Sequence, residues 1–421
     1  MTEKPSDEDV KKMYLKITSH DNKVTRLAVD SIEEVTEEGK KLYKITAEAK
    51  DLIQHTDPTK VRNKYVHYIE KPVPKVENVY YNFKELVDAM NADKNGTFKI
   101  GADLNATNVP TPKKWYVDGD FRGTLKSVDG KHYTIHNTER PLFKNIIGGT
   151  VTKVNLGNVN INMPWADRIA PIADTIKGGA KIEDVKVTGN VLGRNWVSGF
   201  IDKIDNQGTL RNVAFIGNVT AVGDGGQYLT GIVGENWKGL VEKAYVDANL
   251  VGDKAKAAGI AYSSQNGGDN GAVSRDGAIK KSVAKGTINV AKPIENGGVV
   301  GSMKHHGSVE DSVSMMKVSN GEIFYGSSDI DYDDGYWTGN NVKRNYVVVG
   351  VSDGNSSYQR SKDKNRIKPI SEEEAKSKIE ATGISADKYE INEPIVNRLN
   401  RLTRKEDEYK TTQDYKTERD L

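Results

Sequence analysis

The chain has 421 residues, which is long enough for two or three domains. It carries 61 Lys and Arg residues against 59 Asp and Glu residues, so no overall charge points to nucleic acid or an anionic membrane as a partner. Cysteine is absent, which excludes disulfides, thiolate metal sites and a cysteine nucleophile, and no apolar run approaches the roughly 20 residues that span a bilayer.

The first 75 residues predict a small β-rich module and a linker. Residues 1–10 are polar and are expected to be disordered, and their start reads like the edge of a fragment, so the targeting signal is expected to lie outside this sequence. Short runs in which apolar and polar residues alternate, as in strands, follow at 14–17, 24–29, 42–45 and 65–69. The proline-containing stretch 71–75 then predicts a stiff linker.

A short amphipathic helix is predicted over residues 82–90, with Asn82 as its N-cap. Its apolar residues share one face: Phe83, Leu86, Val87 and Met90. It comes directly before the first repeat, near residue 97. We therefore expect it to cover the first open end of the repeat array that follows.

An internal repeat of about thirty residues dominates the middle of the chain. Each repeat has an apolar lead position, and successive leads are 28 to 38 residues apart: Val151, Ile182, Leu210, Val241, Ile279, Val309 and Val342. Small or apolar residues follow each lead after three, five and seven positions, for example Val185, Val187 and Gly189 after Ile182. A further short strand beginning at a glycine recurs at 199–201, 231–234, 259–261 and 298–301, and more loosely at 323–326.

This repeat predicts a right-handed parallel β-helix over residues 76–360. One repeat cannot bury its apolar side, whereas repeats stacked about 4.8 Å apart bury one another. A β-propeller is the main alternative, but its blades need about four strands in about 40 residues, and only three are counted in about thirty. Beyond residue 351 the repeat ends, and residues 361–421 predict helices that lead to a downstream domain. The first of these has Ser371 as N-cap with Glu374 completing a capping box, and the second covers about 393–410.

Aromatic residues are the strongest candidates for a binding site. Trp196 and Tyr228 each lie three residues before the glycine of their repeat, so stacked coils would place one above the other. Trp237 and Trp165 fall in nearby corners. These side chains can form a structural aromatic ladder or a flat platform for a peptide or sugar, and Trp196, Tyr228 and Trp237 are the substrate-binding candidates.

No catalytic motif is found. None of the seven histidines begins an HExxH zinc motif, and neither a Gly-x-Ser-x-Gly elbow nor a phosphate-binding loop is present. Asp329, Asp331 and Asp333 are spaced like the start of a calcium loop. Asp334 occupies the place of the turn glycine, however, so a solvated acidic insert is the simpler interpretation. No cofactor is expected in this chain.

Two stretches resemble known families. Residues 230–246 and 298–313 resemble the glycine-rich GLUG repeat of bacterial surface proteins. Residues 81–93, followed by Gly96-Thr97-Phe98, resemble the N-terminal region of streptococcal zinc metalloproteases, of which the immunoglobulin A protease is the best-known member. This second resemblance covers roughly residues 76–400.

The resemblance implies a non-catalytic piece of a secreted, cell-wall-linked protease. Its peptidase domain, with an HExxH helix and zinc, would follow downstream, and its host substrate would be immunoglobulin A. Three functions remain open: a substrate-recognition or spacer domain, a cell-surface adhesin or stalk, and a polysaccharide-acting β-helix enzyme. Because one fold serves all three, the fold does not decide between them.

Overall fold

The computed structural model describes residues 4–18, 24–37, 40–48, 64–71, 76–107, 109–265, 277–292, 296–304, 307–322, 324–328, 342–351, 353–355, 367–384 and 395–401. The chain forms two compact units, one of residues 1–75 with 392–421 and one of residues 76–391. Of the described C-terminal residues, 367–384 belong to the second unit and 395–401 to the first.

The first unit is an antiparallel sheet in the order β1-β2-β3-β4, preceded by the short helix α1 (Asp7–Val10). The strands are β1 (Tyr14–Thr18), β2 (Val24–Glu37), β3 (Lys40–Glu48) and β4 (Lys64–Glu70), and they contain the four predicted runs. Val29, Ile32, Tyr43 and Ile45 belong to its core. Tyr43 and Ile45 alternate along β3, whereas a register shift between Val29 and Ser31 of β2 brings Val29 and Ile32 to the same side. Residues 395–401 are helical, and the side chain of Asn400 binds the backbone N and O of Tyr68 at 2.8 and 2.9 Å.

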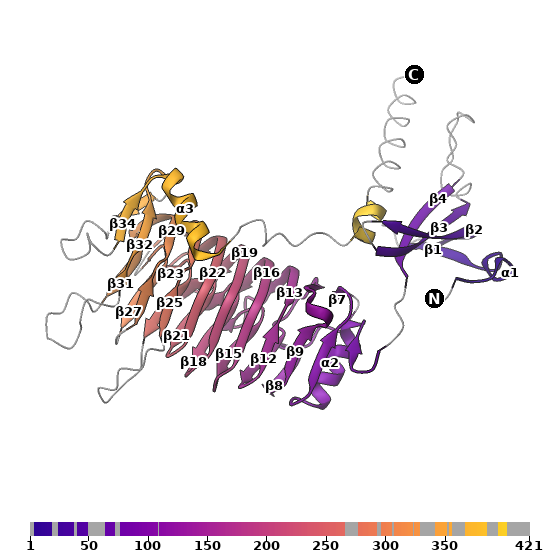
Figure 1. The fold of residues 1–421 in the computed structure, drawn as a ribbon, viewed down its shortest axis with the longest axis horizontal. Coiled ribbons are helices and arrows are strands. Elements are labelled where there is room, and N and C mark those ends of the chain that lie inside the picture. The colour runs from indigo at the N-terminus through magenta and orange to yellow at the C-terminus, as the bar shows by residue number, and fades with distance from the viewer. Residues whose placement is uncertain are drawn as a thin grey trace, which may run out of the picture. The chain divides into compact units, whose positions relative to one another are not determined.

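The second unit is a parallel β-solenoid of about 7 turns, which confirms the predicted fold class (Figure 1). Its walls are three sheets, and strands of successive coils pair in parallel. An eight-stranded sheet contains β8 (Val117–Phe121), β11 (Phe143–Ile147), β15 (Ala173–Lys177), β18 (Ile201–Asp205), β21 (Val233–Trp237), β24 (Ala261–Gln265), β27 (Val300–Lys304) and β30 (Tyr325–Ser328). A four-stranded sheet contains β14 (Arg168–Ile169), β17 (Trp196–Ser198), β20 (Gln227–Thr230) and β23 (Ala255–Ala258).

The remaining wall is an 18-stranded sheet that wraps around a corner of each coil. Its strands are β5 (Val79–Tyr80), β6 (Thr97–Ile100), β7 (Leu104–Asn105), β9 (Thr124–Ser127), β10 (Tyr133–His136), β12 (Thr150–Thr152), β13 (Val154–Asn162), β16 (Lys181–Gly193), β19 (Thr209–Ala221), β22 (Leu240–Gly252), β25 (Ala278–Lys280), β26 (Val283–Val290), β28 (Ser308–Glu310), β29 (Val313–Glu322), β31 (Val342–Lys343), β32 (Asn345–Val348), β33 (Asp353–Asn355) and β34 (Ile367–Ile370). A single-turn 3-10 helix, Val128–Gly130, follows β9.

The predicted lead residues stack in register along the solenoid. Each pairs with the lead of the next coil, from Val151 with Ile182 through to Val309 with Val342. All of them are at most 1% exposed. The repeat therefore arises because successive coils bury one another's apolar side chains, as the spacing predicts. Parallel pairing between successive coils also excludes a β-propeller, because the blades of a propeller are arranged radially around a central channel.

The interior becomes partly polar in the later coils, where Ser282, Ser312 and Asn345 occupy the third position after the lead and are fully buried. Each accepts a hydrogen bond from the backbone of the preceding coil. The backbone N of Ala244 donates to Ser282 Oγ at 3.2 Å, and that of Ser282 donates to Ser312 Oγ at 3.2 Å. The N of Ser312 donates to Asn345 Oδ1 at 3.0 Å. This ladder lets buried polar groups be satisfied inside the coil.

Each coil turns a corner at the second residue after its lead, where the backbone is left-handed. The residues at this corner have φ between 50° and 56° and none is glycine: Lys153, Asp184, Asn212, Lys243, Lys281, Asp311 and Arg344. A left-handed conformation costs a residue with a side chain about 1–2 kcal/mol. Stacking keeps the corner in place, and in one pair the Arg344 guanidinium binds Asp311 at 2.6 and 2.9 Å.

We expect Lys281→Val to destabilise the solenoid by at least about 1 kcal/mol relative to Lys281→Gly. A β-branched side chain is strained at the left-handed φ of Lys281, whereas glycine adopts it without strain. Relief of strain in Lys281→Gly is offset by the larger unfolded-state entropy of glycine, so that variant should be close to wild type. Urea unfolding of the three proteins measures this, and equal midpoints for the two variants would contradict the account.

The two helices of the second unit have different positions. Helix α2 (Phe83–Ala92) begins at the N-cap Asn82, and its four predicted apolar residues join the main core at the first coil, as expected of an end cap (Figure 1). Helix α3 (Glu372–Thr382) has the predicted capping box. It packs on β29 and β32, and its Ala375 covers an apolar stripe on the outer face that includes Tyr245, Val283 and Val313.

Candidate functional site

An aromatic ladder lies on the outside of the four-stranded sheet. Trp196 of β17 and Tyr228 of β20 are paired in register, and their rings are stacked with centroids 3.5 Å apart and planes 11° apart. Both side chains are half-buried. The structure thus confirms that these two residues lie one above the other, which follows from their equal offset from the glycine of each repeat.

Cations and a third ring extend this ladder. Arg168 precedes Trp196 by one coil, and its guanidinium lies 4.3 Å from the Trp196 ring. On the other side, Lys256 pairs in register with Tyr228, and its Nζ donates to the Tyr262 hydroxyl at 3.1 Å. Tyr262 meets Tyr228 edge-on at 4.8 Å. Trp196 therefore has Arg168 on one face and Tyr228 on the other, which leaves ring edges rather than a flat ring face for a ligand.

Arg168 also joins three coils through two carboxylates. Its Nε lies 2.5 Å from Asp202 of β18, and its second terminal nitrogen lies 2.9 Å from Glu235 of β21. Asp202 is 1% exposed, and among the described residues its Oδ1 has no hydrogen-bond partner. Burial raises the pKa of Asp202 to about 7, against the opposing effect of Arg168.

A second acidic group continues the same surface toward the first coils. Asp174 of β15 accepts hydrogen bonds from Lys114 Nζ and Trp115 Nε1, each at 3.0 Å. Burial raises the pKa of Asp174, and the charge of Asp174 in turn contributes to the raised pKa of Asp202. Lys114 and Lys144 lie 4.5 and 4.8 Å from the Trp115 ring. We call the accessible members of this set the surface strip: Lys114, Trp115, Asp174, Arg168, Trp196, Glu235, Tyr228 and Lys256. Asp202 and Tyr262 are buried beneath it.

Trp237 is not stacked with Trp196 and Tyr228, although it lies only two residues after Glu235 of the strip, and Lys203, which contacts its ring, pairs in register with Glu235. Trp237 ends β21, it is 37% exposed, and Lys203 Nζ lies 4.1 Å from its ring. Among the described residues, no ring contact joins it to Trp196 or Tyr228. Sequence reasoning also missed Arg168, Asp202 and Tyr262. The coil period could have revealed Arg168, because it lies one coil before Trp196 in the same column.

The two carboxylates beside Arg168 are paired rather than free. Asp202 is buried and both carboxylates near Arg168 are engaged by it, so these groups do not present a free acid and base to a substrate.

Within the described ranges, no group of three or more His, Asp or Glu residues could hold a metal ion. The calcium candidates Asp329, Asp331 and Asp333 lie outside the described residues. The described part of the chain also contains no helix with the length and apolar character needed to cross a membrane.

Comparisons with known proteins agree with the fold. Residues 1–189 match the family described as M26 IgA1-specific Metallo-endopeptidase N-terminal region. The zinc metalloprotease ZmpB of Streptococcus pneumoniae serotype 4 is 38% identical over 98% of this chain and 21% of its own length. An immunoglobulin A1 protease of Streptococcus pneumoniae is 31% identical over 97% of this chain and 21% of its own length. A solved structure titled IgA1 Protease has a TM-score of 0.54 and 25% sequence identity, covering 85% of this chain and 30% of that one.

Fold and matches together define the β-solenoid region of a class of bacterial zinc metalloproteases. The chain belongs to the IgA1 protease and zinc metalloprotease ZmpB family, and it corresponds to the N-terminal region of that family. It spans about a fifth of the length of the curated relatives it matches.

Proposed function

We propose that this chain is a non-catalytic substrate-recognition and spacer region of a secreted, cell-wall-associated zinc metalloendopeptidase that acts on immunoglobulin A. The observation that supports this most directly is the surface strip, which combines aromatic edges with charges of both signs on a rigid solenoid. Aromatic and arginine side chains are enriched where protein interfaces gain most of their binding energy. The substrate and the zinc chemistry in this proposal are taken from the relatives, which are named as a zinc metalloprotease and an immunoglobulin A1 protease.

Such a region would act by raising local substrate concentration. A substrate held on the solenoid meets a peptidase domain of the same polypeptide as an intramolecular partner, which can raise apparent affinity without any new catalytic contact. Zinc would be held in that downstream domain. The coil supplies stiffness because strands of adjacent coils are hydrogen-bonded along its length.

Binding of human immunoglobulin A1 to residues 1–421 tests the proposal. By surface plasmon resonance, we expect saturable binding that Lys256→Glu weakens at least about tenfold, because this variant reverses a charge at one end of the strip. Lys181→Glu is the matched control, since it makes the same charge reversal at an exposed lysine of β16 outside the strip and should leave the affinity unchanged. In the full protease, Lys256→Glu should raise KM and leave kcat unchanged.

Two outcomes would reject this function. Absence of binding to immunoglobulin A1, with the protein folded by circular dichroism, would favour an adhesin or stalk. Loss of affinity in Lys181→Glu but not in Lys256→Glu would place the interface away from the strip.

A further inference from the structure

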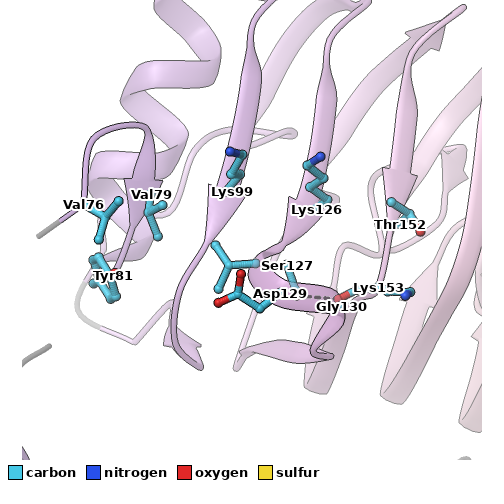
Figure 2. Close-up of a pocket in the computed structure, with 11 residues that line it drawn as sticks. Val76, Val79, Tyr81, Lys99, Lys126, Ser127, Asp129, Gly130, Thr152 and Lys153 are labelled. Carbon is cyan, nitrogen blue, oxygen red and sulfur yellow. Dashed lines mark hydrogen bonds between the residues drawn. The ribbon is translucent and has the colours of Figure 1, made fainter.

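A second surface feature, independent of the strip, lies near the first coils. A hollow of about 600 Å³ is lined by residues of the second unit: Val76, Val79, Tyr81, Lys99, Lys126, Ser127, Val128, Asp129, Gly130, Thr152 and Lys153 (Figure 2). Three of these side chains are lysines and one is an aspartate. The proposed function does not use this region.

The outer column, the position immediately after each lead, shows why the lysines are unusual. These residues pair in register from coil to coil: Lys99, Lys126, Thr152, Glu183, Arg211, Glu242, Lys280, Glu310 and Lys343. From Glu183 onward, acids and bases alternate. Arg211, for example, binds Glu183 at 2.9 Å and Glu242 at 3.0 Å.

The start of the column breaks this alternation. Lys99 and Lys126 are neighbours on β6 and β9, so two ammonium groups are stacked with no acid between them (Figure 2). Like charges directly opposite on adjacent strands are destabilising. Lys153 adds a third cation, and its Nζ lies close to Gly130 at the rim of the hollow. Among the described residues, none of these three lysines has an ion-pair partner within 4.0 Å.

The rest of the lining is apolar or aromatic. Val79 pairs in register with Lys99 and so precedes it in the outer column. Tyr81 comes two residues after Val79 and also lines the hollow. A Cβ added to Gly101 would lie 2.5 Å from Tyr81 and 2.6 Å from Val79, so the glycine allows this wall to pack closely against the backbone. Both side chains are half-buried, as are Lys99 and Lys126.

We propose that this hollow binds an anionic group, phosphate or carboxylate, carried by a ligand with an apolar or aromatic part. Adjacent strands are about 4.8 Å apart, so one anion can receive hydrogen bonds of about 2.8 Å from both Lys99 and Lys126. Such an anion replaces the acid that the rest of the outer column supplies. Tyr81, Val79 and Val128 then contact the apolar part. Asp129 opposes the anion and limits the affinity.

Calorimetric titration of residues 1–421 at low salt with phenyl phosphate and with benzoate tests this assignment. We expect saturable binding of at least one probe, weakened by added salt because the contact is ionic. Binding of phenyl phosphate alone assigns a phosphate ester, benzoate alone assigns a carboxylate, and equal binding assigns an unselective anion site. The methyl signals of Val79 and Val128 should shift on titration, which locates the probe.

Lys99→Glu is the decisive variant because it restores the alternation of the column beside Lys126. We expect it to weaken probe binding at least about tenfold while the melting temperature stays the same or rises. Asp129→Asn should tighten binding about twofold or more, since it removes the opposing charge. Lys280→Gln, in the same column but away from the hollow, is the matched control and should bind as wild type. Absence of saturable binding by both probes, or unchanged binding in Lys99→Glu, would overturn the proposal.

Discussion

Gly217→Ala is expected to cost more than about 4 kcal/mol and to leave the solenoid largely unfolded. Gly217 lies in the middle of β19 with φ of 152°, a conformation that favours glycine. An added Cβ would overlap the carbonyl oxygen of Gly189 on β16, which is backbone and cannot move aside without breaking the pairing of the two strands. Circular dichroism and guanidinium unfolding measure the effect.

Ala248 is the natural control for this substitution. It occupies the same column one coil later, paired with Gly217, and it carries its methyl group with 3% exposure. Its φ is not in the left-handed region. Ala248→Gly should therefore cost only about 1 kcal/mol, from lost burial and backbone entropy. Similar losses for the two variants would show that the close approach at Gly217 does not govern stability.

Arg168→Ala is expected to cost about 2–4 kcal/mol at pH 7.5, the second largest effect. It leaves Asp202 buried without the guanidinium that binds it and removes the link between three coils. Arg168 itself is 38% exposed on its side chain, so solvent screens part of the interaction and the expected cost stays below that of a fully buried pair. Urea unfolding measures the change in free energy.

Arg211→Ala provides the matched comparison. Arg211 also bridges two carboxylates on adjacent coils, Glu183 and Glu242, but all three side chains are more exposed than Asp202. Its removal should cost no more than about 1 kcal/mol. If the two arginine variants lost equal stability, burial of Asp202 would not be the cause of the larger effect.

The Arg168 effect should also depend on pH. Asp202 has a folded pKa of about 7, above its ordinary value of 3.8, so the folded state holds a proton that the unfolded state has released between these pH values. Its contribution to stability is therefore largest at low pH and is lost as pH rises toward 7. Protonated Asp202 needs no cation, so Arg168→Ala should cost less at pH 5 than at pH 7.5. In the Asp202→Asn background, the cost of Arg168→Ala should no longer depend on pH. If Arg168→Ala cost the same at pH 5 and pH 7.5 with Asp202 present, the explanation from Asp202 protonation would be wrong.

The sequence by itself determined the solenoid and its register. Lead residues such as Ile182, Leu210 and Val241 recur because every coil must bury the same side. Each repeat therefore carries the apolar pattern in its own sequence, where it can be recognised without the structure. The end helix α2 and the capping box of α3 were predictable for a similar reason, since caps and apolar faces depend on neighbours in the chain. Even the stacking of Trp196 on Tyr228 followed from the period alone.

Other features were decided only by the tertiary structure. The left-handed corner carries Lys, Asp, Asn and Arg rather than glycine. Its position therefore cannot be predicted from residue type, because stacking between coils maintains the left-handed conformation. The acidic surroundings of Arg168 come from a different sheet, and Asn400 reaches β4 of the first unit from the far end of the chain. These contacts depend on which separate strands are adjacent in the folded protein. The spacing of apolar residues along one strand predicts which side a residue faces, but it does not predict these long-range contacts.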